Sequence, residues 1–502
     1  MKILNAARLN LILSPLVVLF SALSSLLVIR FLSPTLYADY ATLMSFLSLF
    51  MLLAESGCNV GIARYLSEAS KQNARYTLYI KLQLRRWFVV AVMAIILFIA
   101  APNWAFGNNL TSFGWTNSTF ILIAILAAFM LHTQLASSSM LNSFRHGKVL
   151  LISQAVMLLR AFTLVLLAIF IQQPKVLFLI LIPIAFIEAI VMNNSATSEF
   201  SSENSKINTS FLNKAQIHGL VAVFDKITTA LTNGPFLILI LAGLYSRVEL
   251  AYLAAATELL QKFLSVVALP ISNLILPILN NSYKESHKYK LNLEIVGALS
   301  TLIFSFFVGG IAISLLKGIP LVLGDEYLGV VLLAAIWLVP LFFEALVRMV
   351  WGAALLTVGE YKWLNIYNFF YALFSVLIIF YGLDFFTMTS LMISLGILRV
   401  FMALILLYKA NSRGYLNLSS FPVHIALVCS VGACVSVSGQ MLFVGFPDYF
   451  VFSIGLFLYC IFVLAMFRFV PLIPKGAYEA IVQLLGKHSK YFLFAVPLFI
   501  KN

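Results

Sequence analysis

Charged side chains are scarce in this sequence. Only 10% of its 502 residues are Asp, Glu, Lys or Arg, whereas 62% are hydrophobic and the mean hydropathy is +1.03. A soluble protein of this length needs far more charge to cover its surface. The few charges lie in short clusters between apolar runs of about 20 residues, the length that a helix needs to cross a bilayer. The composition therefore excludes a soluble globular protein and predicts a chain solvated mainly by lipid.

The sequence motifs of enzymes and metal sites are also missing. No HExxH, GxSxG, GxxxxGK[ST] or DxD pattern occurs, and the six histidines show no ligand spacing. The four cysteines fall in apolar runs, which is typical of buried small side chains rather than of a disulfide framework or metal site. No loop is long enough for a catalytic or nucleotide-binding domain. We therefore expect no enzymatic activity, cofactor, metal or nucleic-acid partner, and no ATP-driven transport by this chain alone.

Long apolar runs are what the sequence contains instead. Val89–Ala101 and Leu373–Tyr381 do not alternate between apolar and polar residues, so helices rather than barrel strands are expected. The predicted fold class is an all-α polytopic membrane protein with about fourteen transmembrane helices. Their approximate cores are 10–32, 40–64, 87–106, 119–143, 149–171, 176–195, 216–243, 250–279, 292–323, 328–357, 361–382, 385–408, 421–445 and 448–471.

The distribution of the 32 basic residues predicts the orientation of these spans. Lys2 and Arg8 precede the apolar stretch Leu9–Leu32, which exceeds the about 7–15 residues of a signal peptide and is expected to be an uncleaved first span. If the N-terminus is cytoplasmic, alternation places most basic residues on the cytoplasmic side, as the positive-inside rule requires. Both termini are therefore expected in the cytoplasm. The opposite side then holds Arg30, Lys175, Arg247 and Lys317.

One polar loop divides the chain into predicted domains. Residues 196–215, which include TSEFSSENSKINTS, are expected to be a cytoplasmic linker between an N-terminal six-helix lobe, 1–195, and a C-terminal six-helix lobe, 216–408. Two additional transmembrane helices, 409–472, and an amphipathic then apolar tail, 473–502, follow. Leu32–Tyr40 and Tyr245–Tyr252 are weakly similar as openings of the two halves. Repeated halves with a substrate site at their interface are typical of transporters.

Ionisable residues inside the predicted spans are the candidates for a functional site. Each costs at least about 2.5–3.5 kcal/mol at the bilayer centre, so it should face the protein interior or a water-filled cavity. Glu258 and Lys262 stand at i,i+4, as do Glu344 and Arg348, which places each pair on one helix face. Internal ion pairs and a substrate site both explain this spacing, and the sequence leaves the two interpretations open.

Two further cations have no acid one turn away. Arg160 has none at i,i+4, and Lys226 adjoins Asp225, whose side chain points to a different helix face. Arg399, like Arg64, lies near a predicted cytoplasmic end and is expected to extend to the interface. The basic residues predicted to line a cationic cavity are Arg160, Lys226, Lys262 and Arg348. The acids predicted to pair with them or to couple transport are Glu55, Asp225, Glu258 and Glu344.

A cationic cavity suits lipid pyrophosphates. Their charge cannot enter hydrocarbon unpaired. Arg binds phosphate through two parallel hydrogen bonds, and Lys contributes a point charge. The sequence therefore predicts that an anionic lipid is the substrate.

One segment resembles a known family. Residues 30–68 read RFLSPTLYADYATLMSFLSLFMLLAESGCNVGIARYLSE and resemble the opening of the polysaccharide transporters of the MOP flippase superfamily, the Wzx-type O-antigen and capsule flippases. The pattern is an Arg-x-Leu-Gly-Pro-like turn, a Tyr-Gly-x-Tyr-like helix start, and an acid with Gly-Leu and a later Arg. Ser33 and Ala38 replace its first two glycines. The matching residues are Arg30, Leu32, Pro34, Tyr37, Tyr40, Glu55, Gly57 and Arg64.

The resemblance implies two six-helix, MATE-like lobes around a cationic cavity that opens to one side at a time. It implies a flippase of the bacterial inner membrane that moves an undecaprenyl-pyrophosphate-linked oligosaccharide, an O-antigen (lipopolysaccharide) or capsule repeat unit, to the periplasmic leaflet. The implied partners are that substrate, membrane lipids, a polysaccharide polymerase and a chain-length regulator. A peptidoglycan-precursor flippase or multidrug exporter of the same superfamily is the first alternative. A membrane polymerase or ligase is the second, although the predicted topology lacks its large periplasmic loop.

Overall fold

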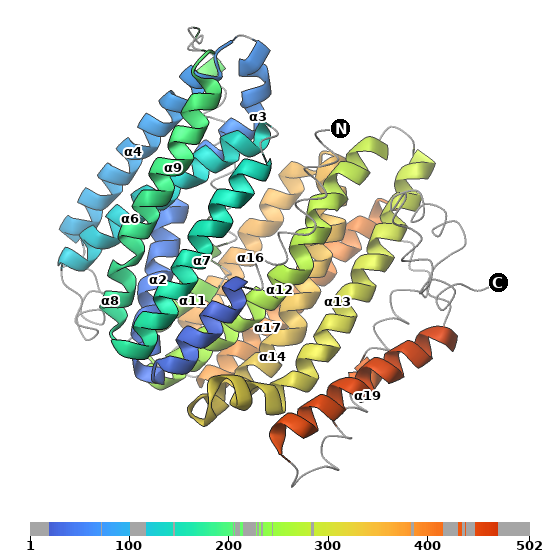
Figure 1. Ribbon diagram of the computed structural model, residues 1–502. Helices are drawn as coiled ribbons and strands as arrows, with labels where there is room; N and C mark the ends of the chain where they lie inside the picture. The colour runs from blue at the N-terminus through green and yellow to red at the C-terminus, as the bar shows by residue number, and fades with distance from the viewer. Residues whose placement is uncertain are drawn as a thin grey trace. The chain divides into compact units, whose positions relative to one another are not determined.

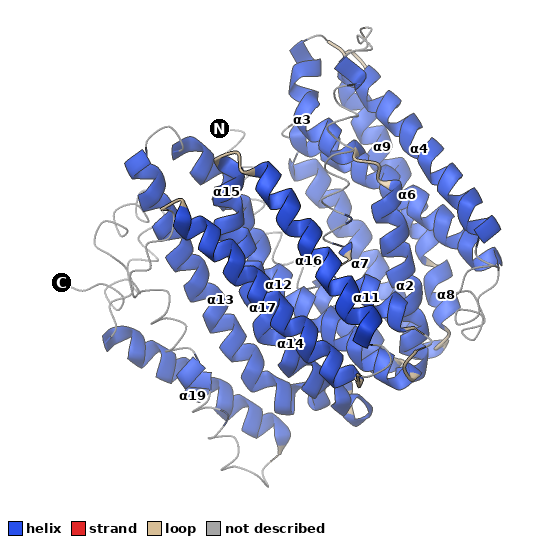
Figure 2. Cartoon of the chain, turned by 180° about the vertical axis from the view of Figure 1, so that it is seen from behind, coloured by secondary structure: helices blue, strands red, loops and turns tan. Residues whose placement is uncertain are grey.

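Helices make up the regular structure of the described part of the chain in the computed structural model, and no strand is assigned there (Figures 1 and 2). The fold is therefore all-α, as predicted. The structure describes residues 20–71, 73–100, 117–143, 146–203, 205, 211–213, 227, 230–231, 234–242, 244–282, 286–382, 386–414, 430–433, 437 and 447–469.

Nine helices among the described residues are long and apolar enough to cross a membrane. Shorter apolar helices occur at Phe20–Phe31 and Tyr449–Val463. These helices confirm a multi-pass membrane protein, whereas the count of about fourteen stays a prediction. Most of the predicted spans 216–243 and 421–445 lies outside the described residues, as does the whole tail 473–502. The nine helices are Pro34–Ala54, Ser118–Asn142, Gly147–Phe170, Pro174–Phe200, Arg247–Ala268, Asn292–Leu315, Asp325–Thr357, Lys362–Gly382 and Met388–Ser412.

The chain separates into two compact units. Unit 1 comprises Met1–Lys262 and Tyr367–Met388, and unit 2 comprises Phe263–Ile366 and Thr389–Asn502. Unit 1 therefore continues through the predicted linker at 196–215. The boundaries predicted for the two lobes, the linker, the additional helices and the tail stay predictions.

Unit 1 is organised around α6. This helix packs against α2, α3, α4 and α9, and α2 also packs against α11. A buried cluster that includes Leu78, Leu135 and Met192 fills the space among α3, α4, α6 and α9. The helices of unit 1 are α2 (Pro34–Ala54), α3 (Cys58–Lys71), α4 (Arg75–Ala100), α6 (Asn117–Asn142), α7 (His146–Phe170), α8 (Pro174–Leu179), α9 (Leu181–Phe200), α11 (Gly234–Leu241) and the first part of α12 (Arg247–Ser282).

The predicted span 40–64 is a broken helix rather than a single one. α2 begins at Pro34, whose fixed φ suits the first helical position, and ends at Ala54. Ser56 and Gly57 then adopt φ values of 48° and 72°, and α3 begins at Cys58. Glycine takes this left-handed conformation at little cost, whereas Ser56 is strained by it. The hydrophobic pattern continues through the break, which is why it predicted one span.

Unit 2 is organised around α13, which packs against α14 and α19. On α19, the Tyr459 hydroxyl donates a hydrogen bond of 2.9 Å to the Phe306 carbonyl of α13. A Cβ atom at Gly309 would overlap this hydroxyl, so glycine makes the close approach possible. The helices of unit 2 are α13 (Ser286–Leu323), the 3₁₀ turn η2 (Asp325–Tyr327), α14 (Leu328–Val347), the π-helical turn η3 (Arg348–Gly352), α15 (Ala353–Thr357), α17 (Met388–Ser412) and α19 (Asp448–Phe469), and α16 (Tyr361–Gly382) divides between the units.

Candidate functional site

The predicted pair on α12 forms. Lys262 Nζ lies 3.4 Å from Glu258 Oε1, and the two side chains are 28% and 36% exposed. Lys262 Nζ also donates a 2.8 Å hydrogen bond to Ser21 Oγ, and Ser25 Oγ donates a 3.0 Å hydrogen bond to Glu258 Oε1. The i,i+4 pair is therefore part of a four-residue seam between the helix Phe20–Phe31 and α12.

Helix geometry explains the seam. Ser21 and Ser25 are one turn apart, and so are Glu258 and Lys262, so each helix presents two polar groups on one face. The earlier serine meets the later charged residue, which is the order of contacts between antiparallel helices. A serine hydroxyl can either donate or accept a hydrogen bond, so Ser21 accepts one from the ammonium and Ser25 donates one to the carboxylate.

Arg160 has an acid partner that its own helix does not supply. Its Nη2 on α7 lies 3.3 Å from Glu188 Oε2 on α9, with side chains 30% and 14% exposed. Arg160 Nε is buried without a hydrogen-bond partner. Tyr40 on α2 interacts electrostatically with both Arg160 and Glu258. Two of the predicted cavity cations, Arg160 and Lys262, thus lie in unit 1, each paired with a carboxylate.

The third described cation, Arg348, belongs to a cluster in unit 2. Arg348 Nε lies 3.0 Å from Glu344 Oε1, and the other carboxylate oxygen accepts a hydrogen bond from Arg399 Nη1. The Arg399 guanidinium also lies over the Trp337 ring, 4.5 Å from its centroid. The expectation that Arg399 extends to the interface was wrong, because its side chain is only 5% exposed and is held by Glu344 and Trp337.

The remaining predicted residues are placed as follows. Glu55 is buried at the C-terminal end of α2, next to the helix break at Gly57. Arg30 is exposed, and the Tyr37 and Tyr40 rings lie 6.5 Å apart on α2. Lys226 and Asp225 lie outside the described residues, as does the Arg64 side chain. No group of three potential metal ligands occurs in the part of the chain that the structure describes.

Two of the basic residues that the sequence places opposite the cytoplasm gather near Asp39. Arg247 Nη1 at the start of α12 lies 3.8 Å from Asp39 Oδ2, and Lys175 also attracts this carboxylate electrostatically. Asp39 Oδ1 is buried without a hydrogen-bond partner. The ion pair joins the beginnings of α2 and α12, and Lys175 on α8 is near enough to attract the same carboxylate. The predicted topology places these three helix beginnings at the same membrane surface.

Sequence reasoning missed one fully buried cation, Arg86. It lies on α4 with only 2% exposure, and its guanidinium donates to the Leu131 carbonyl and, at 2.9 Å, to Asn59 Oδ1. The guanidinium is also attracted by Glu55. The nearby basic residues Lys81 and Arg85 made Arg86 indistinguishable in sequence from a charge in a cytoplasmic loop. Its hydrogen-bond partners come from distant parts of the sequence.

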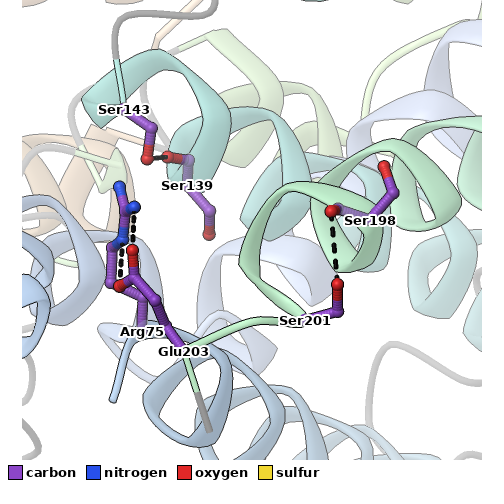
Figure 3. Close-up of polar contacts among 6 residues, drawn as sticks. All are labelled: Arg75, Ser139, Ser143, Ser198, Ser201 and Glu203. Atoms are coloured by element: carbon purple, nitrogen blue, oxygen red, sulfur yellow. Dashed lines mark hydrogen bonds and ion pairs between the residues drawn. The ribbon is translucent and has the colours of Figure 1, made fainter. Parts of the chain in front are cut away.

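A further ion pair that the sequence did not indicate joins Glu203, within the predicted linker 196–215, to Arg75 (Figure 3). Arg75 Nε donates a 2.6 Å hydrogen bond to Glu203 Oε2, and Arg75 Nη2 contacts the other oxygen. Ser205 and Asn73 add a backbone hydrogen bond of 2.8 Å. Hydrogen bonding to Glu203 raises the pKa of the Arg75 guanidinium above its ordinary value. The segment after α9 is therefore fastened to the turn between α3 and α4.

Comparisons with known proteins give one family and one fold. The family described as polysaccharide biosynthesis protein matches residues 9–282. No curated protein matches the chain. The lipid II flippase MurJ in an inward closed conformation is similar at a TM-score of 0.68 and 14% identity, covering 91% of this chain and 98% of that one.

Two MATE transporters extend the structural likeness. An inward-facing multidrug resistance MATE family transporter of the MOP superfamily gives a TM-score of 0.59 and 13% identity, covering 79% of this chain and 94% of that one. A variant of the Vibrio cholerae MATE transporter VcmN gives a TM-score of 0.54 and 14% identity, covering 82% of this chain and 98% of that one. At these identities the likeness shows the fold alone. The fold predicted by resemblance, that of MOP superfamily transporters, is confirmed.

Proposed function

The chain belongs to the polysaccharide biosynthesis protein family, and from this premise we propose that it is a flippase for an undecaprenyl-pyrophosphate-linked oligosaccharide. The cargo is an O-antigen or capsule repeat unit, and it moves from the cytoplasmic to the periplasmic leaflet of a bacterial inner membrane by alternating access. Both termini are cytoplasmic, and the protein breaks no covalent bond of its substrate. The family match over residues 9–282 is the observation that carries the proposal.

The membrane interior requires such a protein to compensate the pyrophosphate charge. An unpaired charge is costly in hydrocarbon, so the path of the head group must offer cations. Arg160 and Lys262 supply them in unit 1, and Arg348 supplies one in unit 2. Lys226, whose surroundings the structure does not describe, is proposed as a fourth. The other proposed partners of the protein are the membrane lipids around its exposed apolar helices, a polysaccharide polymerase and a chain-length regulator.

The carboxylates that pair with these cations determine how the cations can bind a phosphate. Each of the three described cations contacts a carboxylate: Arg160 with Glu188, Lys262 with Glu258 and Arg348 with Glu344. A phosphate therefore exchanges places with a carboxylate instead of entering a site of unpaired cations. The exchange keeps the cations compensated when no cargo is bound, which avoids the cost of an isolated buried charge. Glu55 and Asp225 are proposed as further pairing or coupling acids.

A peptidoglycan-precursor flippase is the second candidate function. The TM-score of 0.68 to a lipid II flippase is the observation that favours it. Loss of a sole peptidoglycan-precursor flippase should stop growth, whereas loss of a repeat-unit flippase should only remove surface sugar. Viability of a deletion strain therefore separates the two functions.

Deletion of the gene with analysis of the lipid pool tests the proposal. We expect viable cells that lack the surface polysaccharide and accumulate the lipid-linked repeat unit in the inner leaflet. Re-expression of the full chain should reverse both changes. Normal surface polysaccharide in the deletion strain, with no accumulated lipid-linked sugar, would contradict the proposed function.

A further inference from the structure

One carboxylate in unit 2 serves two arginines from two helices. Glu344 Oε1 contacts Arg348 on its own helical run, and Oε2 contacts Arg399 on α17. Within this trio, positive charges outnumber negative ones by one. The two arginines differ in how firmly the surrounding structure holds them, and this difference assigns them different tasks.

The Arg399 side chain is buried and contacts both a carboxylate and an aromatic ring. Its side chain is 5% exposed, its guanidinium covers the Trp337 ring at 4.5 Å, and Glu344 accepts its hydrogen bond. One turn before these residues, α14 and α17 approach closely, because a Cβ atom at Gly396 would lie 3.2 Å from Pro340 Cγ. A planar guanidinium between a carboxylate and an indole ring is an arrangement that lysine does not reproduce. Arg399 is therefore a fixed counter-ion.

Arg348 sits in a more adaptable setting. Its side chain is 26% exposed, compared with 7% for Glu344. It is the first residue of the π-helical turn Arg348–Gly352, which interrupts an otherwise α-helical run. Single π turns within α-helices occur frequently at functional sites. Arg348 therefore lies at a backbone irregularity and is more exposed than Arg399, which lies on the regular helix α17.

We propose that the two arginines divide the work on Glu344, an inference that rests on the proposed function. Arg348 leaves Glu344 Oε1 and binds the pyrophosphate of the cargo through its guanidinium. Arg399 is a positioning residue that stays on Oε2. Because Arg399 keeps the buried carboxylate compensated, the departure of Arg348 does not leave an isolated buried charge, which would be strongly destabilising.

Ligand binding and thermal stability of the full chain distinguish the two tasks. The purified protein in lipid nanodiscs is titrated with undecaprenyl pyrophosphate, and its melting temperature is measured without ligand. We expect Arg348→Gln to weaken binding about tenfold or more, the loss of one charge-assisted contact, with little change in melting temperature. We expect Arg399→Gln to lower the melting temperature by several degrees. Arg348→Lys should retain part of the binding, whereas Arg399→Lys should be as unstable as Arg399→Gln.

A matched control lies directly after α17, the helix that carries Arg399. Arg413 shares Glu360 with Lys409 and is 49% exposed, so Arg413→Gln should change neither quantity. Wild-type binding by Arg348→Gln, or a loss of binding by Arg399→Gln at unchanged melting temperature, would overturn the division of tasks. Failure of the wild-type protein to bind undecaprenyl pyrophosphate would overturn both the division of tasks between the two arginines and the proposed recognition of pyrophosphate. Analysis of the lipid pool in the deletion strain tests the proposed function separately, because that experiment uses none of these variants.

Discussion

Ser25 and Glu258 are joined by a 3.0 Å hydrogen bond although 233 residues separate them in the sequence. With Ser21 and Lys262 one turn away, this contact makes a polar seam inside an apolar unit. The seam contains one carboxylate and one ammonium, each with a neutral hydroxyl as its second partner. Neutral partners are weaker than charged ones, so the ammonium remains available to a phosphate.

Neutralisation of Lys262 should impair transport without unfolding the protein. We expect Lys262→Gln to reduce surface polysaccharide about tenfold, the effect of losing one charge-assisted contact. The melting temperature should change little, because partly exposed ion pairs contribute only about 0–1 kcal/mol. Ser21→Ala removes a neutral hydroxyl at the same place and serves as the control, with near-normal transport. Normal surface polysaccharide from Lys262→Gln at equal expression would remove Lys262 from the site.

The contact between Asp39 and Arg247 should restrain the ends of α2 and α12. Asp39→Asn removes the charge that Arg247 Nη1 meets at 3.8 Å. We expect a Val248→Cys side chain, which is half-buried next to Arg247 at the start of α12, to react faster with a membrane-impermeant thiol reagent from the periplasmic side when Asp39→Asn is also present. An Arg30→Cys probe, also predicted on the periplasmic side, should react equally with and without Asp39→Asn. Equal rates at both probes would show that this ion pair does not hold the helices together.

The Arg75–Glu203 pair should contribute measurably to the stability of unit 1. Its side chains are 21% and 17% exposed, and the carboxylate accepts hydrogen bonds at both oxygens. We expect Glu203→Gln to cost about 1–2 kcal/mol of unfolding free energy and to lower the melting temperature. The double exchange Arg75→Glu with Glu203→Arg should recover part of this loss. An unchanged melting temperature in Glu203→Gln would mean that the backbone contacts alone fasten the segment.

Two adjacent glycines on α13 offer a matched test of how α19 packs. A Cβ atom at Gly309 would overlap the Tyr459 hydroxyl, whereas one at Gly310 meets nothing within 4 Å. We expect Gly309→Ala to destabilise the packing by about 1–3 kcal/mol, the usual cost of overfilling a close contact. Gly310→Ala should be neutral. Faster proteolysis at 448–469 in Gly309→Ala alone is the predicted readout, and equal proteolysis of both variants would contradict the packing.

Local spacing predicted some of the site, and tertiary packing determined the rest. Glu258 with Lys262 and Glu344 with Arg348 were predictable because i,i+4 neighbours share a helix face. Arg160 with Glu188 was not, since the partner comes from a helix whose packing the sequence does not specify. The same holds for Arg399 with Glu344, which are 55 residues apart.

Hydropathy predicted helices more reliably than their interruptions. The helical run 328–357 has the predicted bounds, yet it contains a π turn that no residue pattern indicated. The break at Ser56 and Gly57 was also missed, because apolar residues on both sides continue the pattern of a single span. Backbone irregularities of this kind depend on neighbouring helices that satisfy the released backbone groups.

Flipping by the purified full chain tests the central claim most directly. Proteoliposomes are loaded with an undecaprenyl-pyrophosphate-linked oligosaccharide, and its exposure on the opposite leaflet is followed with a sugar-modifying enzyme that cannot cross the membrane. We predict that the wild type makes the whole lipid-linked pool accessible, and that a variant combining Lys262→Gln with Arg348→Gln leaves about half protected, the share of the leaflet that the enzyme cannot reach. Equal accessibility in wild-type, variant and protein-free vesicles would contradict the account.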